Sequence, residues 1–193
     1  MRSIATTDSR LGFALLGLID QAPRSGYDLR KVFAQTPLGR FSDSPGTIYP
    51  ALLRLRRKGW IEPVAEGRPS GRRRQVFRLT VAGRRAFVAW LKRLPTRAEV
   101  ERDPDGVALR LAFTSQALPP SAVRRFLEAW RREVEAHVQD LQRFLATEGG
   151  SGLSVSGRLA FESGLEGFRG HARWVTGALR RLRSVDRPER RRP

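Results

Sequence analysis

Residues 41–80 read FSDSPGTIYPALLRLRRKGWIEPVAEGRPSGRRRQVFRLT and indicate the fold of the N-terminal part of the chain. Apolar residues recur at helical spacing over 45–58, and the polar residues before this range are suited to cap a helix. Gly59 is suited to the left-handed position that ends one. Pro50 has no amide donor, so it favours a hydrogen-bonded start near 46–47. We predict an amphipathic helix with a basic outer side.

A pair of short apolar runs, at 61–65 and 75–79, follows this helix and predicts two β-strands. The turn between them combines Gly and Pro with several arginines, three of them adjacent at 72–74. Adjacent like charges repel one another, so such a turn favours an anionic partner. A helix followed by a basic hairpin predicts a winged helix-turn-helix with a two-stranded wing. In that fold a helix fits the major groove of DNA, and the wing can reach phosphates or the minor groove.

Positive charge is concentrated in the same region. Residues 40–93 hold 14 Lys and Arg against three acids, a net charge of +11 out of +18 for the chain. Residues 101–179 hold ten basic and ten acidic residues. A general need for solubility would not concentrate charge in one part of the chain, whereas a surface that binds a polyanion would.

Helical patterns on both sides complete the N-terminal domain. The spacing predicts helices at 8–21 and 81–94, and SGYD at 25–28 predicts a capping box for a short helix between them. We expect 1–95 to be the winged helix-turn-helix domain and 96–105 to be a hinge.

The second half of the chain, 106–183, is predicted to be a helical dimerisation domain, so the protein is mainly α. Two long helices carry apolar residues at alternating spacings of four and three, which is a heptad pattern. We expect these helices to be antiparallel and to pack on each other and on a second subunit. The residues expected at the dimer interface are Leu127, Trp130, Val134, Leu141, Phe168, Val175, Leu179 and Leu182. Residues 184–193 are expected to be a disordered basic tail.

Composition and motifs argue against several classes of protein. The chain has no Cys and two His, so disulfides, thiolate chemistry and a metal site are not expected. No cofactor is expected either. No apolar stretch approaches the roughly 20 residues that span a bilayer, and no signal peptide is recognisable, so we expect a cytoplasmic protein without membrane contact. The G-x-S-x-G, Walker A and G-x-G-x-x-G motifs are missing, which argues against an enzyme.

Four motifs, in order, resemble the PadR family of transcriptional regulators. They are SGYDL at 25–29, SPGTIYPAL at 44–52, RLRRKGWI at 54–61 and FRLTVAGRRAF at 77–87. The layout after them is similar, more loosely, to the helical C-terminal dimerisation domain of virulence-activator type found in one PadR subgroup. The resemblance implies a homodimer that binds an inverted repeat in double-stranded DNA, usually as a repressor.

These arguments predict which residues contact DNA. They are Ser44, Thr47, Tyr49, Arg54, Arg57, Lys58, Arg68, Arg72, Arg73 and Arg74. We expect Thr47, Tyr49 and Arg54 to lie nearest the bases and the wing arginines to hold the backbone. The cations of the helix could equally form a solvated surface.

Two questions stay open at this point. Trp130, Phe168 and Trp174 fit interface core better than a pocket for a small aromatic effector, although either is compatible with the pattern. The function that fits best is a sequence-specific regulator, namely a homodimeric PadR-type repressor with release by a small ligand. The alternatives are a non-specific architectural nucleic-acid-binding protein and a PadR-like activator without ligand. Competition against bulk DNA separates a regulator from an architectural protein.

Overall fold

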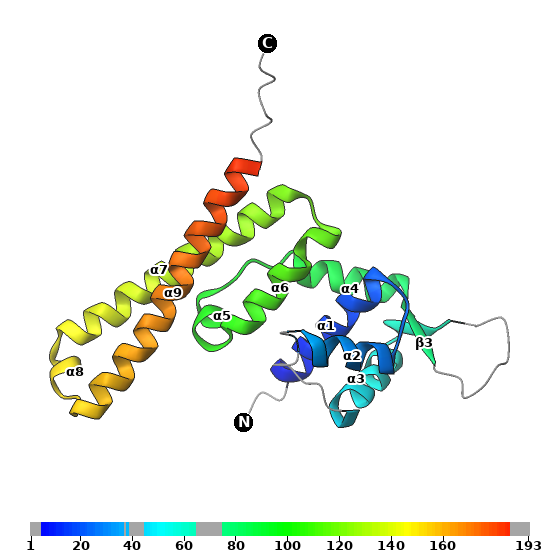
Figure 1. The fold of residues 1–193 in the computed structure, drawn as a ribbon, viewed down its shortest axis with the longest axis horizontal. Helices are drawn as coiled ribbons and strands as arrows, with labels where there is room; N and C mark the ends of the chain where they lie inside the picture. Colours follow the sequence, from blue (N-terminus) through cyan, green and yellow to red (C-terminus); the bar gives the residue numbers. More distant parts are fainter. Residues whose placement is uncertain (1–4, 37, 39–44, 65–74, 186–193) are drawn as a thin grey trace, which may run out of the picture. The chain divides into compact units, whose positions relative to one another are not determined.

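The computed structural model of the chain describes residues 5–36, 38, 45–64 and 75–185 (Figure 1). The chain divides into two compact units, unit 1 at 1–92 and unit 2 at 93–193. None of the described helices is long and apolar enough to cross a membrane.

Unit 1 consists of four helices and a small sheet among its described residues. Its elements are α1 (Ala5–Gln21), β1 (Arg24–Ser25), α2 (Gly26–Gln35), α3 (Pro45–Arg57), β2 (Ile61–Pro63), β3 (Val76–Leu79) and α4 (Val81–Leu91). The strands form an antiparallel sheet in the order β1-β3-β2. Strands β2 and β3 are the predicted wing strands, and β1 adds a third that we did not expect. The prediction of a winged helix-turn-helix in a mainly α protein is confirmed.

Local capping defines where the helices of unit 1 begin and end. The Ser25 hydroxyl accepts a hydrogen bond from the backbone N–H of Asp28 (3.2 Å), whose carboxylate accepts one from the N–H of Ser25 (3.0 Å). Thr80 caps α4 by accepting from the N–H of Gly83 (3.0 Å). Gly59 has a φ of 67°, which an L side chain rarely adopts, and it follows the end of α3 as predicted. Each side-chain cap stabilises its helix by about 1 kcal/mol.

Helix α3 contains Pro50 in its interior and begins at Pro45, earlier than the proline favours. An interior proline costs about 3 kcal/mol because it removes a backbone hydrogen bond. The buried side of α3 offsets that cost, since each of its apolar side chains is at most 4% exposed and each of the Ile and Leu side chains stabilises the fold by roughly 1.5–3 kcal/mol when buried. These side chains are Ile48, Ala51, Leu52 and Leu55.

The core of unit 1 forms where α1 meets α3, α4 and β3. Its fully buried side chains include Leu15, Leu29, Phe33 and Phe87. Helix α4 ends at Leu91, earlier than the predicted residue 94, and Leu94 is 47% exposed rather than buried as the spacing had suggested.

Unit 2 is helical throughout its described residues. Its elements are α5 (Arg97–Arg102), α6 (Pro104–Ala117), α7 (Pro120–Ala146), α8 (Glu148–Ser151) and α9 (Val155–Val185). The range 96–105, expected to be a hinge, is instead occupied by α5 and the start of α6. Thr96 caps α5 with a capping box, and the Asp103 carboxylate accepts from the N–H of Gly106 (2.8 Å) to cap α6. Both capping signals are present in the sequence.

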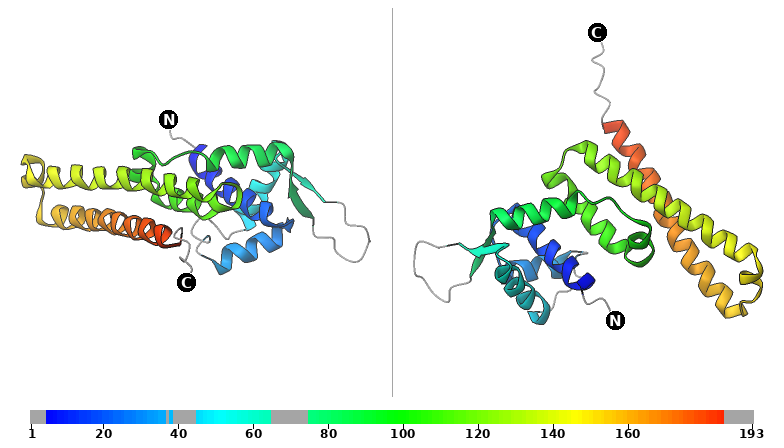
Figure 2. Two further views of the ribbon diagram at one scale, coloured as in Figure 1. Left: turned by 90° about the horizontal axis from the view of Figure 1, so that it is seen from above. Right: turned by 180° about the vertical axis from the view of Figure 1, so that it is seen from behind.

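Helices α7 and α9 lie side by side and are joined at one end by α8 (Figure 2). The heptad residues face inward between them and against α5 and α6. Five residues of the predicted dimer interface are buried in this core of a single chain, namely Leu127, Trp130, Val134, Val175 and Leu179. Phe168 and Leu182 pack against it, and Leu141 is half-buried. The heptad residues therefore pack the helices of one chain on each other. That a second subunit also contacts them stays a prediction.

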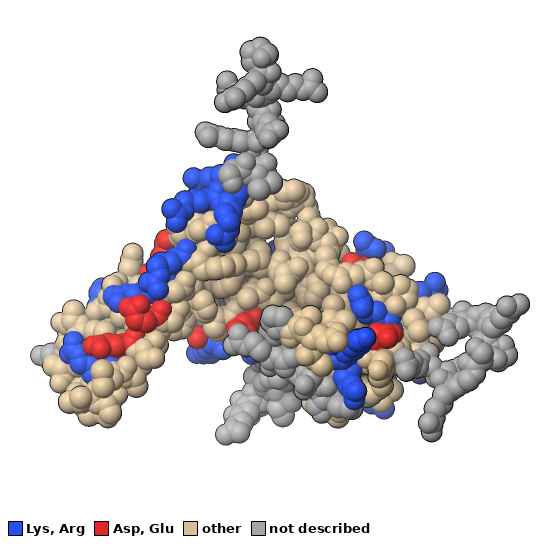
Figure 3. All heavy atoms as spheres, in the orientation of Figure 1, with Lys and Arg blue, Asp and Glu red and all other residues tan. Residues whose placement is uncertain are grey.

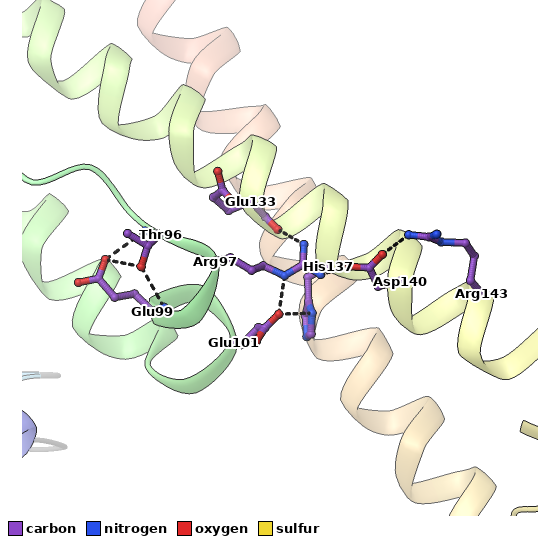
Figure 4. A network of polar contacts seen from close by, with 8 residues as sticks. All are labelled: Thr96, Arg97, Glu99, Glu101, Glu133, His137, Asp140 and Arg143. Carbon is purple, nitrogen blue, oxygen red and sulfur yellow. Dashed lines mark hydrogen bonds and ion pairs between the residues drawn. The ribbon is translucent and has the colours of Figure 1, made fainter. Parts of the chain in front are cut away.

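A polar network joins α5 to α7 (Figure 4). The Arg97 guanidinium donates to Glu101 (2.5 Å), to Asp140 and to the backbone carbonyl of Glu133 (3.2 Å). The Nδ1 atom of His137 lies 3.2 Å from the Glu101 carboxylate. Burial lowers the pKa of His137 below its ordinary value, and the charge of Arg97 adds to this. The hydrogen bond from Arg97 lowers the pKa of Glu101.

An ion pair between a buried arginine and a half-buried glutamate joins α5 to α6. Arg110 is 2% exposed, and its Nη2 atom lies 3.0 Å from the carboxylate of Glu99. Burial raises the pKa of Glu99, but the hydrogen bond and charge of Arg110 outweigh burial and leave the pKa below its ordinary value. Removing Glu99 would leave the buried charge of Arg110 uncompensated, so this contact holds α5 in place.

Candidate nucleic-acid interface

Helix α3 turns one side to the core of unit 1 and leaves the other in solvent. The exposed residues of this outer face are Gly46, Thr47, Tyr49, Pro50, Leu53, Arg56 and Arg57, and Lys58 is exposed just beyond the end of the helix. Of the DNA-contacting residues predicted on the helix, Thr47, Tyr49, Arg57 and Lys58 are thus accessible, and Arg54 is half-buried. An anchored helix with an open outer face is the arrangement that allows side chains to reach base edges in a groove.

The three residues predicted to lie nearest the bases are not on one line along α3. At 3.6 residues per turn, Thr47 and Tyr49 are roughly 160° apart around the helix. Arg54 lies on the flank of Thr47, and Tyr49 lies on the other flank. The centre of the outer face holds Leu53, which is 53% exposed and which the sequence reasoning missed. Its position opposite the buried residues of α3 could have been found from the helical spacing.

The flank of α3 that carries Tyr49 adjoins α2. Tyr49 is 46% exposed, and its ring lies against Gly26, the first residue of α2. Beside it, Tyr27 is 43% exposed, and the guanidinium of Arg30 lies over its ring, 5.8 Å from the centroid. Lys31 is exposed on the same helix. The sequence reasoning missed these α2 residues, although they alternate with buried Leu29 and Phe33 at helical spacing.

Two further cations adjoin the C-terminal end of α3 and the sheet. The ammonium of Lys58 lies over the ring of Trp60, 4.9 Å from its centroid, a contact worth about 0.5–1 kcal/mol at an exposed site. Arg78 on β3 pairs with Glu62 on β2 across the sheet, at 2.8 Å. Ser44, Arg68, Arg72, Arg73 and Arg74 lie outside the described residues, so their roles stay predictions.

The aromatic residues predicted as an effector pocket lie together in unit 2. The rings of Trp130 and Trp174 are 5.5 Å apart, and the ring of Phe168 meets His137 edge-on at 4.3 Å. Trp130 is 2% exposed, whereas Trp174 is 46% exposed. The indole N–H of Trp130 has no hydrogen-bond partner among the described residues. Among all the residues that the structure describes, no group of three or more His, Asp or Glu could hold a metal ion.

Charge is arranged differently along α9. On the face drawn in Figure 3, acidic and basic side chains alternate over the N-terminal part of α9, and basic ones gather near its C-terminal end. Glu162 pairs with Arg158 (3.0 Å) and Glu166 with Arg169 (2.5 Å), whereas Arg180, Arg181 and Arg183 are exposed at the end. Cations at a helix C-terminus stabilise it through the helix dipole.

Residues 15–89 match the family model described as the transcriptional regulator PadR-like family. The matched segment runs from α1 into α4 and includes the whole of α3. Unit 1 belongs to the PadR-like family. This family is described as one of transcriptional regulators, and the match places a PadR-like winged helix within unit 1. The resemblance seen in the sequence motifs is thereby confirmed. The likeness of the second half to the virulence-activator type stays a prediction.

Several solved structures are similar to the chain. Bacillus subtilis PadR in complex with operator DNA is 24% identical, with 89% of this chain and 98% of that chain covered and a TM-score of 0.41. The same protein in complex with p-coumaric acid is 24% identical over 91% and 96%, with a TM-score of 0.40. A PadR-like transcriptional regulator from Bacillus cereus is 21% identical over 91% and 99%, with a TM-score of 0.40. No curated protein sequence matches the chain.

Proposed function

We propose that this PadR-like regulator is a homodimeric repressor that binds an inverted-repeat operator by sequence and is released from it by a small ligand. The outer face of α3 carries the proposal. A protein that only neutralises phosphates needs cations, whereas α3 also exposes Tyr49 and Leu53 on a helix held firmly by its buried side. Exposed aromatic and aliphatic groups contribute to binding where they meet base edges or thymine methyl groups. This observation favours sequence readout over the architectural alternative.

The described residues then divide into two roles. Leu53 faces the base edges from the centre of the outer face, and Tyr49 and Thr47 reach them from opposite flanks. Arg54, with a longer reach, contacts a base or a phosphate from the flank of Thr47. Arg57 and Lys58 at the end of α3 contact phosphates, which fix the register of the helix on the duplex. Ser44 and the wing arginines Arg68, Arg72, Arg73 and Arg74 are proposed for the adjoining backbone or minor groove.

A competition experiment tests this readout. A duplex selected from a randomised library by the wild-type protein should be bound about a thousandfold more tightly than a scrambled duplex of the same composition. Tyr49→Ala should reduce that preference about fivefold, the loss of roughly 1 kcal/mol, and leave binding to the scrambled duplex unchanged. Phe144→Ala, which removes a comparably exposed aromatic from unit 2, is the matched control. Equal affinity for the two duplexes would establish the architectural alternative instead.

The proposed dimer rests on a second heptad series on α9. This series consists of Ser163, Gly167, Gly170, Trp174 and Gly177, at spacings of four, three, four and three. Ser163, Gly167 and Trp174 are exposed, and nothing lies within 4 Å of the place that a Cβ atom at Gly167 would take. Glycine costs about 1 kcal/mol relative to alanine in a helix, so repeated glycines need a reason. Close approach of a second helix is such a reason, and a second copy of the chain is the occupant we propose.

Repression and ligand release complete the proposal. A dimer holding two winged helices on successive half-sites would cover DNA that RNA polymerase needs. The proposed ligand site includes Trp130, Phe168 and Trp174. The half-exposed ring of Trp174 and the unpartnered indole N–H of Trp130 suit a small aromatic molecule that carries a hydrogen-bond acceptor.

A further inference from the structure

We propose that Gly26 is a positioning residue that determines the orientation of the Tyr49 ring and thereby the sequence preference of α3. The inference rests on the proposed readout of DNA by Tyr49 and extends it to a residue on another helix. Gly26 itself is buried and is not proposed to touch DNA.

The contact between these two residues is unusually close. A Cβ atom added to Gly26 would lie 2.6 Å from Cε1 of Tyr49 and 3.2 Å from both Cδ1 and Cζ. Only a hydrogen atom fits between the α2 backbone and the ring. The Cε1 side of the ring therefore lies against Gly26, while the tyrosine remains 46% exposed.

Local contacts hold both helices beside this ring. The start of α2 is held by the capping box of Ser25 and Asp28, and β1 pairs with β3 immediately before it. Helix α3 is held by Ile48 and Ala51, which are at most 2% exposed. A methyl group at Gly26 would therefore displace the Tyr49 ring rather than either backbone.

Gly26 is required for space and not for its backbone freedom. Its φ lies outside the positive range that favours glycine, since Gly59 is the residue of unit 1 with a positive φ among those described. Alanine would be the better helix former at this position if space were available. The glycine is thus explained by the ring that lies against it.

The experiment compares Gly26→Ala in the wild-type background and in the Tyr49→Ala background. The probes are the selected duplex and its scrambled counterpart. In the wild-type background, Gly26→Ala should lower the preference for the selected duplex about fivefold, as much as Tyr49→Ala does, and leave the affinity for the scrambled duplex unchanged. In the Tyr49→Ala background the same substitution should have no further effect, because the ring is gone. Gly12→Ala, whose Cβ atom would lie 3.7 Å from Leu55, is the control for glycine replacement as such.

A spectroscopic readout reports on the ring directly. The chain has two tyrosines, so a Tyr27→Phe variant leaves Tyr49 as the sole source of tyrosine ring signals in an NMR spectrum. Gly26→Ala should move these signals, whereas Gly12→Ala should leave them in place. A general loss of structure, detected as a lower melting temperature with unchanged Tyr49 signals, would overturn the proposal.

Two other outcomes would also overturn it. One is an unchanged sequence preference in Gly26→Ala, and the other is an equal loss of preference whether or not Tyr49 is present. Failure of the proposed function gives a different result. Tyr49→Ala alone would then leave the sequence preference intact, and Gly26→Ala would still move the NMR signals of Tyr49.

Discussion

Two glycines of unit 1 are expected to respond in opposite ways to the same substitution. A Cβ atom at Gly83 would overlap the backbone carbonyl oxygen of Trp60, which cannot rotate away, whereas at Gly12 it would make an ordinary contact with Leu55. Gly83→Ala should therefore lower the free energy of unfolding by about 3 kcal/mol. Gly12→Ala should raise it by up to about 1 kcal/mol, because alanine favours the helix. Urea unfolding of both variants measures the difference, and similar values for the two would contradict the packing of α4 described above.

A second residue-scale prediction concerns His137 and the dependence of stability on pH. Burial lowers the pKa of His137 below 6.5, so the unfolded chain takes up this proton at a higher pH than the folded one. Stability should fall as the pH drops below about 6.5, and this loss should be complete once the pH is under the folded pKa. The pKa of Glu101 is lowered by the hydrogen bond from Arg97, so its stabilisation is present above 4.5 and is lost as the pH falls through its folded pKa.

The variants His137→Gln and Glu101→Gln test this assignment by urea unfolding at about pH 7.5 and about pH 5.5. His137→Gln should remove most of the loss of stability between these two pH values. Glu101→Gln should enlarge it, because the Glu101 carboxylate favours the protonated imidazole. If His137→Gln loses as much stability between these two pH values as the wild type does, another group is responsible for the loss of stability in this range.

At the scale of elements, α3 and the wing should differ in their dependence on salt. Each phosphate neutralised by a cation makes the fall of log affinity with log salt steeper by about 0.9 on duplex DNA. Changing Arg72, Arg73 and Arg74 together to Ala should reduce the salt slope by roughly two to three units and weaken binding to selected and scrambled duplexes alike. Tyr49→Ala removes no charge and should leave the slope unchanged. Should the wing variant lose binding to the selected duplex only, the division of roles between wing and helix would be wrong.

At the scale of the whole molecule, the glycine series on α9 should control assembly. Light scattering should show a dimer for the wild type and a monomer for Gly170→Leu and Trp174→Glu, because both substitutions block the close approach of a second helix. Val155→Glu is the control, since Val155 is 81% exposed on α9 but lies outside the series. The monomeric variants should also lose operator binding, since one half-site supplies too little affinity. Dissociation by the control alone would place the interface elsewhere.

Ligand release couples two sites in both directions. A small aromatic molecule that raises the melting temperature should weaken operator binding, and operator DNA should weaken binding of that molecule by the same factor. Trp174→Phe, which keeps an aromatic ring in the α9 series, should weaken both effects, and Phe144→Ala, which truncates another exposed aromatic of unit 2, should change neither. Retention of the full response in Trp174→Phe would show that the Trp174 indole contributes packing only.

The sequence by itself determined the elements of unit 1 and its class of partner. The signals for these features are local: Ser25 and Thr80 cap their helices wherever the rest of the chain lies, and helical spacing places Ile48 and Leu55 on one side of α3. The concentration of charge in 40–93 is likewise independent of the fold. Motifs of this kind sufficed to identify a PadR-like winged helix.

Only the tertiary structure decided which faces meet. The two-residue strand β1 has no periodicity of its own and exists because β3 pairs with it. The heptad pattern of α7 and α9 indicated that one side of each helix is buried, but not whether a helix of the same chain or of a second subunit covers it. The fold buries Val134 and Val175 within one chain. The contact of Gly26 with Tyr49 joins two helices that are separate in sequence. Spacing along a chain determines which residues share a face, whereas burial depends on what that face meets in space, and this requires the packed structure.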